Sequence, residues 1–562
     1  MAKSNKRSTR QKKQQDSEVF ERLNRFLQKY QKQIFIASAG LTLLFSFLLF
    51  NFNVSLMGDD GAYIKRAYRL LHDGDFPTFQ GPLYPIVLSF FIWLAGLNVT
   101  FLKALSGVFI LGHLYFFYRA FKDRIPALLY IFTLIILATN AYLVSYSSWT
   151  FSEALFLLLQ AWLFYYLFRH VWEERLKSNR ERIMKFLVLG LLLILLAKTR
   201  SVGYGAVVAV VIFFVFTRQW RSIGYTLGSF GLFYLVFKGV RSIFFGVSSN
   251  AQFGSQFNRL LLKDPYNPGK GKEDLVGFVE RFWNNSELYL SKHTYKFLGL
   301  RPDDVVQTST VLTVIAYILF GLALFYAFRK NKYLLFTGVY IAVMSAVTFF
   351  ILQTRWDQDR LILVFFPLIV PFLLSGLYYL GKDKLPLFRF ILPGLLVVLI
   401  FSNLGRTFNK VDLHQDKFIH HLQGDDLYGL TPDWVNYVKM ARFAAENIPD
   451  NVNIACRKPN IAFIKAQREF YGIHRVNTQD ADKLLQKLAQ SDVRYVIMAS
   501  LRKYPSRKTK YTINTVKRYL YYIQQKYPKA IQLVHRIGQD EQAYLFRINY
   551  NAVGDGKVGG DQ

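Results

Sequence analysis

The chain has 562 residues, of which 52% are hydrophobic and 17% aromatic. These shares exceed what a set of soluble domains can bury and are typical of a protein that faces lipid. The formal net charge is +33, but the basic residues lie mainly in the N-terminal tail, in loops between apolar runs and in the C-terminal region. We therefore expect membrane lipid rather than nucleic acid as the partner of this charge. The single cysteine, Cys456, excludes an intramolecular disulfide and gives no metal-ligand spacing.

The N-terminal tail, residues 1–33, carries ten Lys or Arg residues against three acidic ones. The apolar run that follows, 34–54, has the ~20 residues of a membrane-spanning helix, and no small-residue cleavage site follows it. We expect a retained first helix that starts from a cytoplasmic tail. With this run included, the sequence predicts about eleven transmembrane helices, at about 34–54, 100–120, 126–147, 150–169, 186–199, 201–217, 223–245, 308–328, 333–352, 360–380 and 386–404.

One short apolar run, from Pro82 to Gly96, decides the topology. It begins Pro-Leu-Tyr-Pro and is about fifteen residues long, so we expect a helix that lies against the bundle rather than a span. The loops that then share a side with the N-terminal tail are all basic, as the positive-inside rule requires. Eleven spans place everything after Leu404 on the outer face of what we expect to be a bacterial inner membrane.

Three segments predicted on the outer face are long enough to have a function: 55–81, 247–307 and the part after Leu404. The second contains an amphipathic stretch, 278–297, which favours a helical element that covers a substrate at the membrane interface. Residues 34–404 would form the transmembrane domain and 405–430 a connector. Residues 431–550 alternate helix and strand patterns, which predicts a small extracytoplasmic α/β or α+β domain. The glycine-rich tail, 551–562, is predicted to be disordered.

The first outer segment places two adjacent carboxylates, Asp59 and Asp60, directly outside a membrane helix. Carboxylates beside low-dielectric surroundings have raised pKa values or bind metal, and they are candidates for a general base. The alternative is structural, because acidic residues are favoured in the first turn of a helix, here one that starts near Ala62. The two residues alone do not choose between these interpretations.

The whole segment resembles the first extracytoplasmic loop of the GT-C glycosyltransferases, in particular the protein O-mannosyltransferase and aminoarabinose transferase branch. The motifs stand in the family's order: Asp59-Asp60-Gly-Ala-Tyr63, then Gly74-Asp75, then Gly81-Pro82-Leu83-Tyr84. A weaker resemblance extends to about residue 404 through Ser152-Glu153, and through Arg355 and Arg360 ahead of Pro367. The second acid is often Glu in that branch and is Asp60 here.

The resemblance implies a polytopic enzyme that transfers a sugar, with inversion, from a polyprenyl-phosphate-linked donor to a hydroxyl of a lipid, glycan or protein acceptor. Asp59 would take the proton of that hydroxyl, and Asp60 would orient the acceptor or share the role. Tyr63, Tyr84 and Glu153 would line the acceptor cavity, while Glu153 could equally be a first-turn acid of its own helix. No cofactor is certain from the sequence, and a divalent cation is left open.

Charge gives an argument that does not need the family. Basic groups at the membrane are costly unless paired, and they are functional candidates. A cluster of them that faces the acidic loop would bind the donor phosphate. The alternatives are contacts with lipid headgroups and, for Arg355 and Arg360, pairing with Asp357 or Asp359. Six such residues fall on the predicted outer side: Lys198, Arg200, Lys238, Arg241, Arg355 and Arg360.

Other patterns are weaker. The histidines at 414, 420 and 421 fit no standard metal spacing, and Arg457-Lys458-Pro459 is more simply solvated surface than a contact for phosphate or glycan. No P-loop, dinucleotide fingerprint, Ser-His-Asp arrangement or zinc signature is visible. A lipid-linked glycan flippase or transporter is the first alternative function, although no inverted repeat is found. An O-antigen polymerase or ligase is the second, and it does not need the acidic pair.

Overall fold

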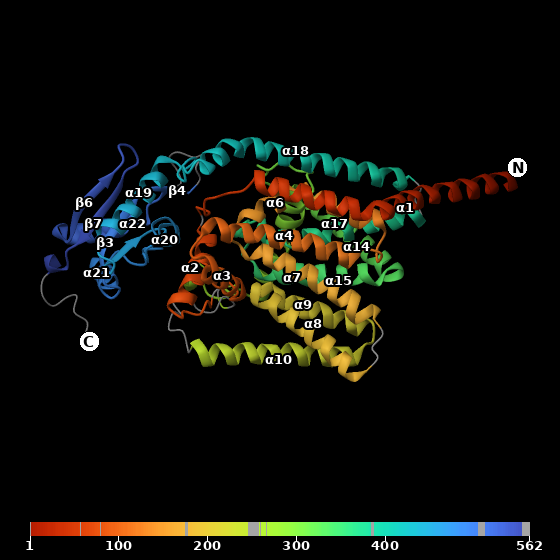
Figure 1. Ribbon diagram of the computed structural model, residues 1–562, viewed down its shortest axis with the longest axis horizontal. Coiled ribbons are helices and arrows are strands. Elements are labelled where there is room, and N and C mark those ends of the chain that lie inside the picture. The colour runs from red at the N-terminus through yellow and green to blue at the C-terminus, as the bar shows by residue number, and fades with distance from the viewer. Residues whose placement is uncertain are drawn as a thin grey trace. The chain divides into compact units, whose positions relative to one another are not determined.

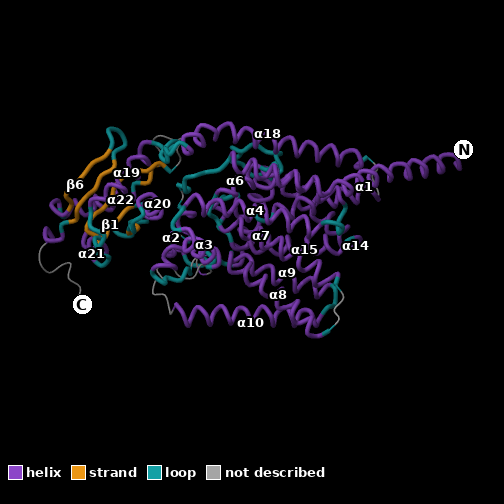
Figure 2. The backbone as a smooth tube through the Cα atoms, in the orientation of Figure 1, coloured by secondary structure: helices purple, strands orange, loops and turns teal. Residues whose placement is uncertain are grey.

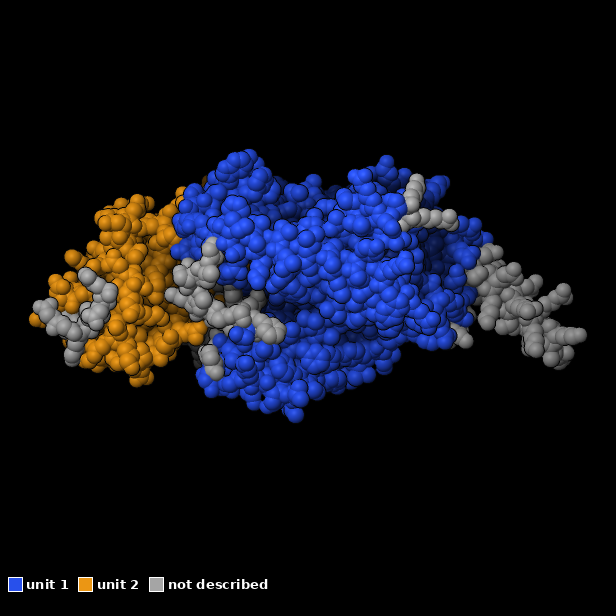
Figure 3. Space-filling model, turned by 90° about the horizontal axis from the view of Figure 1, so that it is seen from below, with its two compact units in different colours: residues 1–50, 69–415 blue, residues 51–68, 416–562 orange. Residues whose placement is uncertain are grey.

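The described part of the computed structural model divides into two compact units (Figure 3). Unit 1 comprises residues 1–50 and 69–415, and unit 2 comprises residues 51–68 and 416–562. Unit 1 is built from helices, and the strands all belong to unit 2 (Figure 2). The residues described are 2–56, 58–78, 80–174, 178–245, 258, 260–265, 267–383, 387–503 and 512–553.

Unit 1 is a bundle of apolar helices (Figure 1). Helices satisfy every backbone hydrogen bond within one segment, which is what a chain in lipid needs. Helix α2 (Asp59–His72) starts in unit 2 and ends in unit 1, and the end of α18 (Phe388–Leu422) belongs to unit 2. The helices of unit 1 are α1 (Ala2–Leu48), α3 (Leu83–Ala95), α4 (Val99–Phe121), α5 (Ala127–Ala138), α6 (Ala141–Ser145), α7 (Ser152–Tyr166), α8 (Asn179–Thr199), α9 (Tyr204–Phe216), α10 (Trp220–Phe245), α12 (Leu275–Ser286), α13 (Tyr295–Phe297), α14 (Thr310–Lys330), α15 (Lys332–Ile351), α16 (Arg360–Leu363), α17 (Phe366–Asp383) and α18 (Phe388–Leu422).

Seven helices in the described ranges are long and apolar enough to cross a membrane, and the bent pair of α5 and α6 makes up to eight. The other three predicted runs lie on α8, on α9, and on α16 with α17. The prediction of a polytopic helical membrane protein with a small C-terminal sheet domain is therefore confirmed. The short run before Gly96 forms α3, which has only 13 residues.

Two boundaries differ from those predicted. Helix α18 does not end near Leu404 but continues to Leu422, through most of the expected connector. Its continuation is stabilised by packing, since Leu404 and Val411 contact the cluster of Phe45 and Leu49 on α1. Residues 51–68, which carry the acidic pair, cluster with the C-terminal part of the chain rather than with the bundle.

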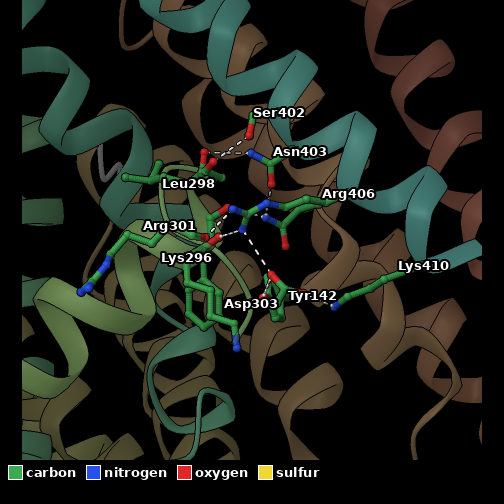
Figure 4. Close-up of polar contacts among 12 residues, drawn as sticks. Tyr142, Lys296, Leu298, Arg301, Asp303, Ser402, Asn403, Arg406 and Lys410 are labelled. Carbon is green, nitrogen blue, oxygen red and sulfur yellow. Dashed lines mark hydrogen bonds and ion pairs between the residues drawn. The ribbon is translucent and has the colours of Figure 1, made fainter. Parts of the chain in front are cut away.

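The second predicted outer segment is described from Leu260 onward, apart from Tyr266. Its amphipathic stretch forms α12, a π-helix from Glu287 to Thr294, and α13. The turn after α13 is held by α18, where the Arg406 guanidinium donates hydrogen bonds to the backbone carbonyls of Lys296 and Arg301 and contacts Asp303 (Figure 4). On the same helix, Ser402 and Asn403 donate to the next carbonyls in that turn, those of Gly299 and Leu298. The described end of this segment is thus fastened to the bundle.

Unit 2 contains a five-stranded mixed sheet in the order β2-β1-β3-β7-β6. Strand β1 runs parallel to β2 and β3, while β7 is antiparallel to both β3 and β6. Its core joins apolar residues of the helices and strands, among them Leu485, Val496 and Ile523. The elements are β1 (Asn453–Cys456), β2 (Tyr471–Gly472), β3 (Val493–Ala499), β4 (Leu501–Arg502), β5 (Thr512–Ile513), β6 (Ile531–Ile537), β7 (Ala543–Ile548), α19 (Pro432–Asn447), α20 (Pro459–Ala466), α21 (Ala481–Ala489) and α22 (Thr515–Lys526).

The sequence pattern predicts helices at 434–447, 481–490 and 515–527 and strands at 452–456, 493–498, 531–537 and 543–548, and the structure has an element at each of these places. The sequence missed α20 and the two-residue strands, which are too short for a periodic pattern. The predicted tail begins inside a short 3-10 helix, Tyr550–Val553. Its remaining residues, 554–562, lie outside the described residues.

One close approach in unit 1 depends on a glycine. Gly81, just before α3, has a φ of +89° and lies against the turn between α8 and α9. A Cβ atom at this position would stand 2.3 Å from the backbone oxygen of Thr199. Only glycine fits both the left-handed conformation and the contact. Gly81 therefore lets the first loop approach the turn that carries Arg200.

We predict that Gly81→Ala lowers the free energy of unfolding by more than about 2 kcal/mol, because the backbone clash adds to the conformational strain. Gly96→Ala is the matched control: Gly96 also has a positive φ, +68°, but a Cβ there would meet nothing within 4 Å. Gly96→Ala should cost about 1–3 kcal/mol, because the backbone there, with ψ at −172°, lies in a region that only glycine adopts readily, and Gly81→Ala should cost more than this control. Thermal unfolding of both variants in detergent measures the difference. Equal shifts in Tm would show that the close approach is not tight.

Candidate active site

The strongest polar cluster inside unit 1 surrounds Glu153. This residue lies in the first turn of α7 and is 2% exposed. Its Oε1 atom lies 2.5 Å from a terminal nitrogen of Arg200 and 4.0 Å from Nε of Arg360. Arg200 follows the last residue of α8, and Arg360 is the first residue of α16. Three helix ends that are distant in sequence therefore meet at one carboxylate.

The two arginines are held by further contacts. The Arg360 guanidinium lies 5.0 Å from the ring centre of Phe151, and its Nε donates a hydrogen bond of 2.8 Å to the Gln358 side chain. Tyr146 is within electrostatic range of Asp359, Glu153, Arg360 and Arg200. Two guanidiniums and two carboxylates therefore lie near this ring. Such a site is suited to a phosphate group, which guanidinium binds through two parallel hydrogen bonds.

The other four cations predicted to bind phosphate have different surroundings. Lys198 donates a 3.0 Å hydrogen bond to the Tyr204 hydroxyl and lies over the rings of Tyr234 and Phe237. Arg241 lies over the ring of Phe76 and within electrostatic range of Lys198. These two cations contact aromatic rings, while Lys238 is exposed on α10. The backbone of Arg355 lies in the short 3-10 helix Thr354–Trp356, but its side chain lies outside the described residues.

Asp357, one of the two carboxylates considered as local partners for Arg355 or Arg360, contacts residues of another segment. It lies 2.6 Å from Lys292 and 2.8 Å from His293, both on the π-helix after α12. The hydrogen bond from His293, together with the one from Lys292, lowers the pKa of Asp357 to about 2. Sequence analysis missed this pair because its members are more than sixty positions apart and no local spacing marks them.

The acidic pair of the first loop lies in unit 2, and its two members differ. Asp60 is fully buried, and its carboxylate accepts hydrogen bonds from the backbone N–H groups of Ser55, at 2.9 and 2.8 Å, and of Gly61, at 3.0 Å. Asp60 therefore holds the turn that starts α2, which is the structural interpretation. Asp59 is half-buried and lies within electrostatic range of Arg66 and Lys458. Asp59 is thus less buried than Asp60 and lies near cations of α2 and of the C-terminal domain.

The tyrosines predicted to line the acceptor cavity are both buried. Tyr63 lies on α2 in unit 2, with the Arg66 guanidinium 5.7 Å from its ring centre. Tyr84 lies on α3 in unit 1. In the parts of the chain that the structure describes, no three His, Cys, Asp or Glu side chains are grouped to hold a metal ion.

The backbone contacts that hold the acidic loop come from the C-terminal domain, within unit 2. Lys458, at the start of α20, donates a 2.7 Å hydrogen bond to the carbonyl of Leu56, and the Asn460 amide donates to the carbonyl of Gly58 at 3.3 Å. A Cβ added to Gly61 would lie 3.3 Å from the Asn460 backbone oxygen. The segment that precedes Asp59 is therefore packed onto α20. This contact joins residues about 400 positions apart, and no sequence pattern predicted it.

Comparison with known proteins yields structural likeness only. No known family profile matches the chain, and no curated protein matches its sequence. The solved structure of ArnT from Cupriavidus metallidurans bound to undecaprenyl phosphate is similar over 94% of this chain and 99% of that one, with a TM-score of 0.53 and 12% identity. The apo oligosaccharyltransferase of Archaeoglobus fulgidus is similar over 84% of this chain and 70% of that one, with a TM-score of 0.50 and 12% identity. The chain thus shares the fold of these two solved structures, as expected from the resemblance of its first outer loop.

Proposed function

We propose that the protein transfers a sugar from a polyprenyl-phosphate-linked donor to an acceptor hydroxyl at the extracytoplasmic face of a bacterial inner membrane. The observation that carries the proposal is the buried Glu153 carboxylate with Arg200 and Arg360 beside it. The fold supports it, because the similar ArnT structure is bound to undecaprenyl phosphate. In this proposal the N-terminal tail is cytoplasmic, and unit 2 lies outside with the acidic loop.

The donor phosphate would bind at the two guanidiniums. When the bond between the anomeric carbon and the phosphate oxygen breaks, negative charge develops on that oxygen. Fixed cations in a dry site stabilise such charge strongly. Glu153 would keep the guanidiniums in place before the donor arrives, since two unpaired cations in a buried position repel each other and are costly.

The acceptor hydroxyl would attack the anomeric carbon from the opposite side, which inverts the configuration. One carbon–oxygen bond would form as the other breaks, and the phosphate would leave with the bonding electrons. The candidate from the sequence for the group that takes the hydroxyl proton is Asp59. Asp60 would act through the backbone, because its carboxylate is already engaged by Ser55 and Gly61. Tyr63 and Tyr84 would shape the acceptor side.

Two of the remaining cations would have secondary roles. Lys198 and Arg241 would attract the donor headgroup from their aromatic surroundings without contacting the scissile bond. A divalent cation bound with the diphosphate or phosphate of the donor is compatible with this scheme but not required by it. The alternative function to test is flipping of a lipid-linked glycan. A flippase would move the lipid-linked sugar across the membrane without consuming it as a donor.

Asp59→Asn should lower the rate of sugar transfer by about 10²–10⁴-fold, because the general base is lost. Asp60→Asn should act differently: the amide keeps an acceptor oxygen for the Ser55 N–H but loses the charge, so we expect a smaller loss of rate together with a lower Tm. The measurement is transfer in vitro from short-chain polyprenyl-phosphate sugars to a mixture of envelope acceptors. Wild-type rates for both variants would overturn the assignment of the acidic loop.

Arg360→Gln should lower kcat by about 10²-fold and weaken donor binding, because one of the two donors to the leaving phosphate is removed. Arg221→Gln is the control, since Arg221 is an exposed residue near the start of α10, at the opposite end of that helix from Arg241. Glu153→Gln should also lose activity, but with a lower Tm, because the buried guanidiniums lose their counter-charge. Donor hydrolysis and transfer are measured separately for each variant. Full activity of Arg360→Gln would exclude a phosphate contact at this position.

A further inference from the structure

A second cluster of charged side chains lies in unit 1, where α6, α18 and the turn after α13 come together (Figure 4). It contains three cations and a carboxylate that contacts two of them, around the buried ring of Tyr142. The topology predicted from the sequence puts all three parts of the chain on the outer side of the membrane. The charged members are Lys296, Asp303, Arg406 and Lys410.

Two of the cations are held at the same aromatic ring. The Lys410 ammonium lies 3.9 Å from the ring centre of Tyr142, and the Lys296 ammonium lies 5.0 Å from the same centre. Figure 4 shows the Lys410 side chain reaching from α18 to this ring. The face of a tyrosine ring attracts a cation without neutralising its charge. The ring therefore holds two like charges near one point.

The carboxylate of the cluster is shared among several groups. Asp303 accepts a hydrogen bond from the Tyr142 hydroxyl, and its oxygens lie 3.4 Å from Arg406 and 3.8 Å from Lys410. A second carboxylate, Asp359, is within electrostatic range of Lys410. In the described ranges of the chain, Lys296 contacts no carboxylate. The positive charge of Lys296 is therefore available to a ligand.

The two lysines also have unused hydrogen-bond donors. Among the residues that the structure describes, neither Nζ atom donates a hydrogen bond, although each ammonium carries three N–H groups. Arg406, in contrast, donates to the carbonyls of Lys296 and Arg301 and so fixes the turn. Lys296 and Lys410 are both half-buried, so their ammonium groups remain accessible. Together they offer positioned donors to a group with several acceptor oxygens.

The cluster adjoins the candidate active site within unit 1. Tyr142 lies four residues before Tyr146, which corresponds to about 6 Å along a helix. Tyr146 is within electrostatic range of Glu153 and of the two arginines beside it. Asp359 is within electrostatic range of both tyrosines and of Lys410. A ligand held at the two lysines would therefore lie beside the Glu153 group rather than in a remote part of the bundle.

We propose that Lys296 and Lys410 bind an anionic group, a phosphate or a carboxylate, that is carried by the sugar acceptor. The acceptor would then be an anionic sugar or glycan. The inference rests on the proposed function, because it takes the ligand of these lysines to be the acceptor. The donor phosphate is assigned to Arg200 and Arg360, which leaves the two lysines for the second substrate. Arg406 is a positioning residue, since it holds the turn next to Lys296.

The test measures binding by calorimetry, with the full-length protein in detergent and three probes: glucose 6-phosphate, glucuronate and neutral glucose. We expect the two anionic probes to bind more tightly than glucose. Lys296→Gln and Lys410→Gln should each weaken that binding by about 10-fold or more, because a hydrogen bond between two charged groups is lost. Lys296 forms no ion pair in the described ranges, so its variant should keep the wild-type Tm even if Lys410→Gln lowers it.

Lys332→Gln is the matched control. The Lys332 ammonium also lies over aromatic rings, 5.1 Å from the ring centre of Tyr333 and 6.0 Å from that of Trp172, but at the start of α15. This variant loses the same charge and the same kind of contact, and it should bind the anionic probes as the wild type does. Arg360→Gln separates the two sites. A loss of binding in Arg360→Gln, with both lysine variants unaffected, would place the anion beside Glu153 and overturn the inference.

Other results also decide against the site. Equal binding of glucose and the anionic probes overturns it, as does wild-type affinity of both lysine variants. A loss confined to phosphatidylglycerol, added in mixed micelles, overturns the acceptor assignment, because the anion would then be a lipid headgroup. The binding measurement involves no sugar transfer. If the lysine variants lose binding but the wild type transfers no sugar, only the proposed function falls, and if the wild type transfers sugar while the variants bind normally, only this inference falls.

Discussion

The buried carboxylate of Glu153 between Arg200 and Arg360 is the constraint around which the bundle is organised. Charges at this depth are stable only as a set, because removal of one partner leaves the others desolvated and unpaired. The set exists only if α7, the turn after α8 and the start of α16 meet at one point. The close contact of Gly81 with Thr199 fixes that turn from the other side. The packing of the apolar helices therefore determines where these few charged side chains lie.

A similar dependence joins the acidic loop to the C-terminal domain. Asp60 closes the turn before α2, while Lys458 and Asn460 hold the carbonyls of Leu56 and Gly58. The position of Asp59 is thus set by hydrogen bonds to backbone groups on both sides. The two carboxylates therefore differ, because Asp60 orders the loop through backbone N–H groups while Asp59 is only half-buried.

The sequence predicted the elements well and their polar partners poorly, for a physical reason. Apolar runs and alternating patterns are local, and lipid or a core must cover them wherever they occur. Ion pairs depend on which helix ends and loops the fold brings together. Glu153 looked like a first-turn acid and is one, yet its partners lie far along the chain. Asp357 contacts Lys292 and His293, which lie more than sixty positions away. The length of the last apolar run also predicted too early an end for α18, because packing on α1 stabilises the helix beyond that run.

Ion pairs account for part of the positive charge of this protein. Arg406 contacts Asp303, and Arg442 and Lys465 share Asp426. A carboxylate that lies between two cations lets the fold hold basic side chains close together without an uncompensated charge. The same arrangement is found at Glu153, which contacts Arg200 and lies 4.0 Å from Arg360.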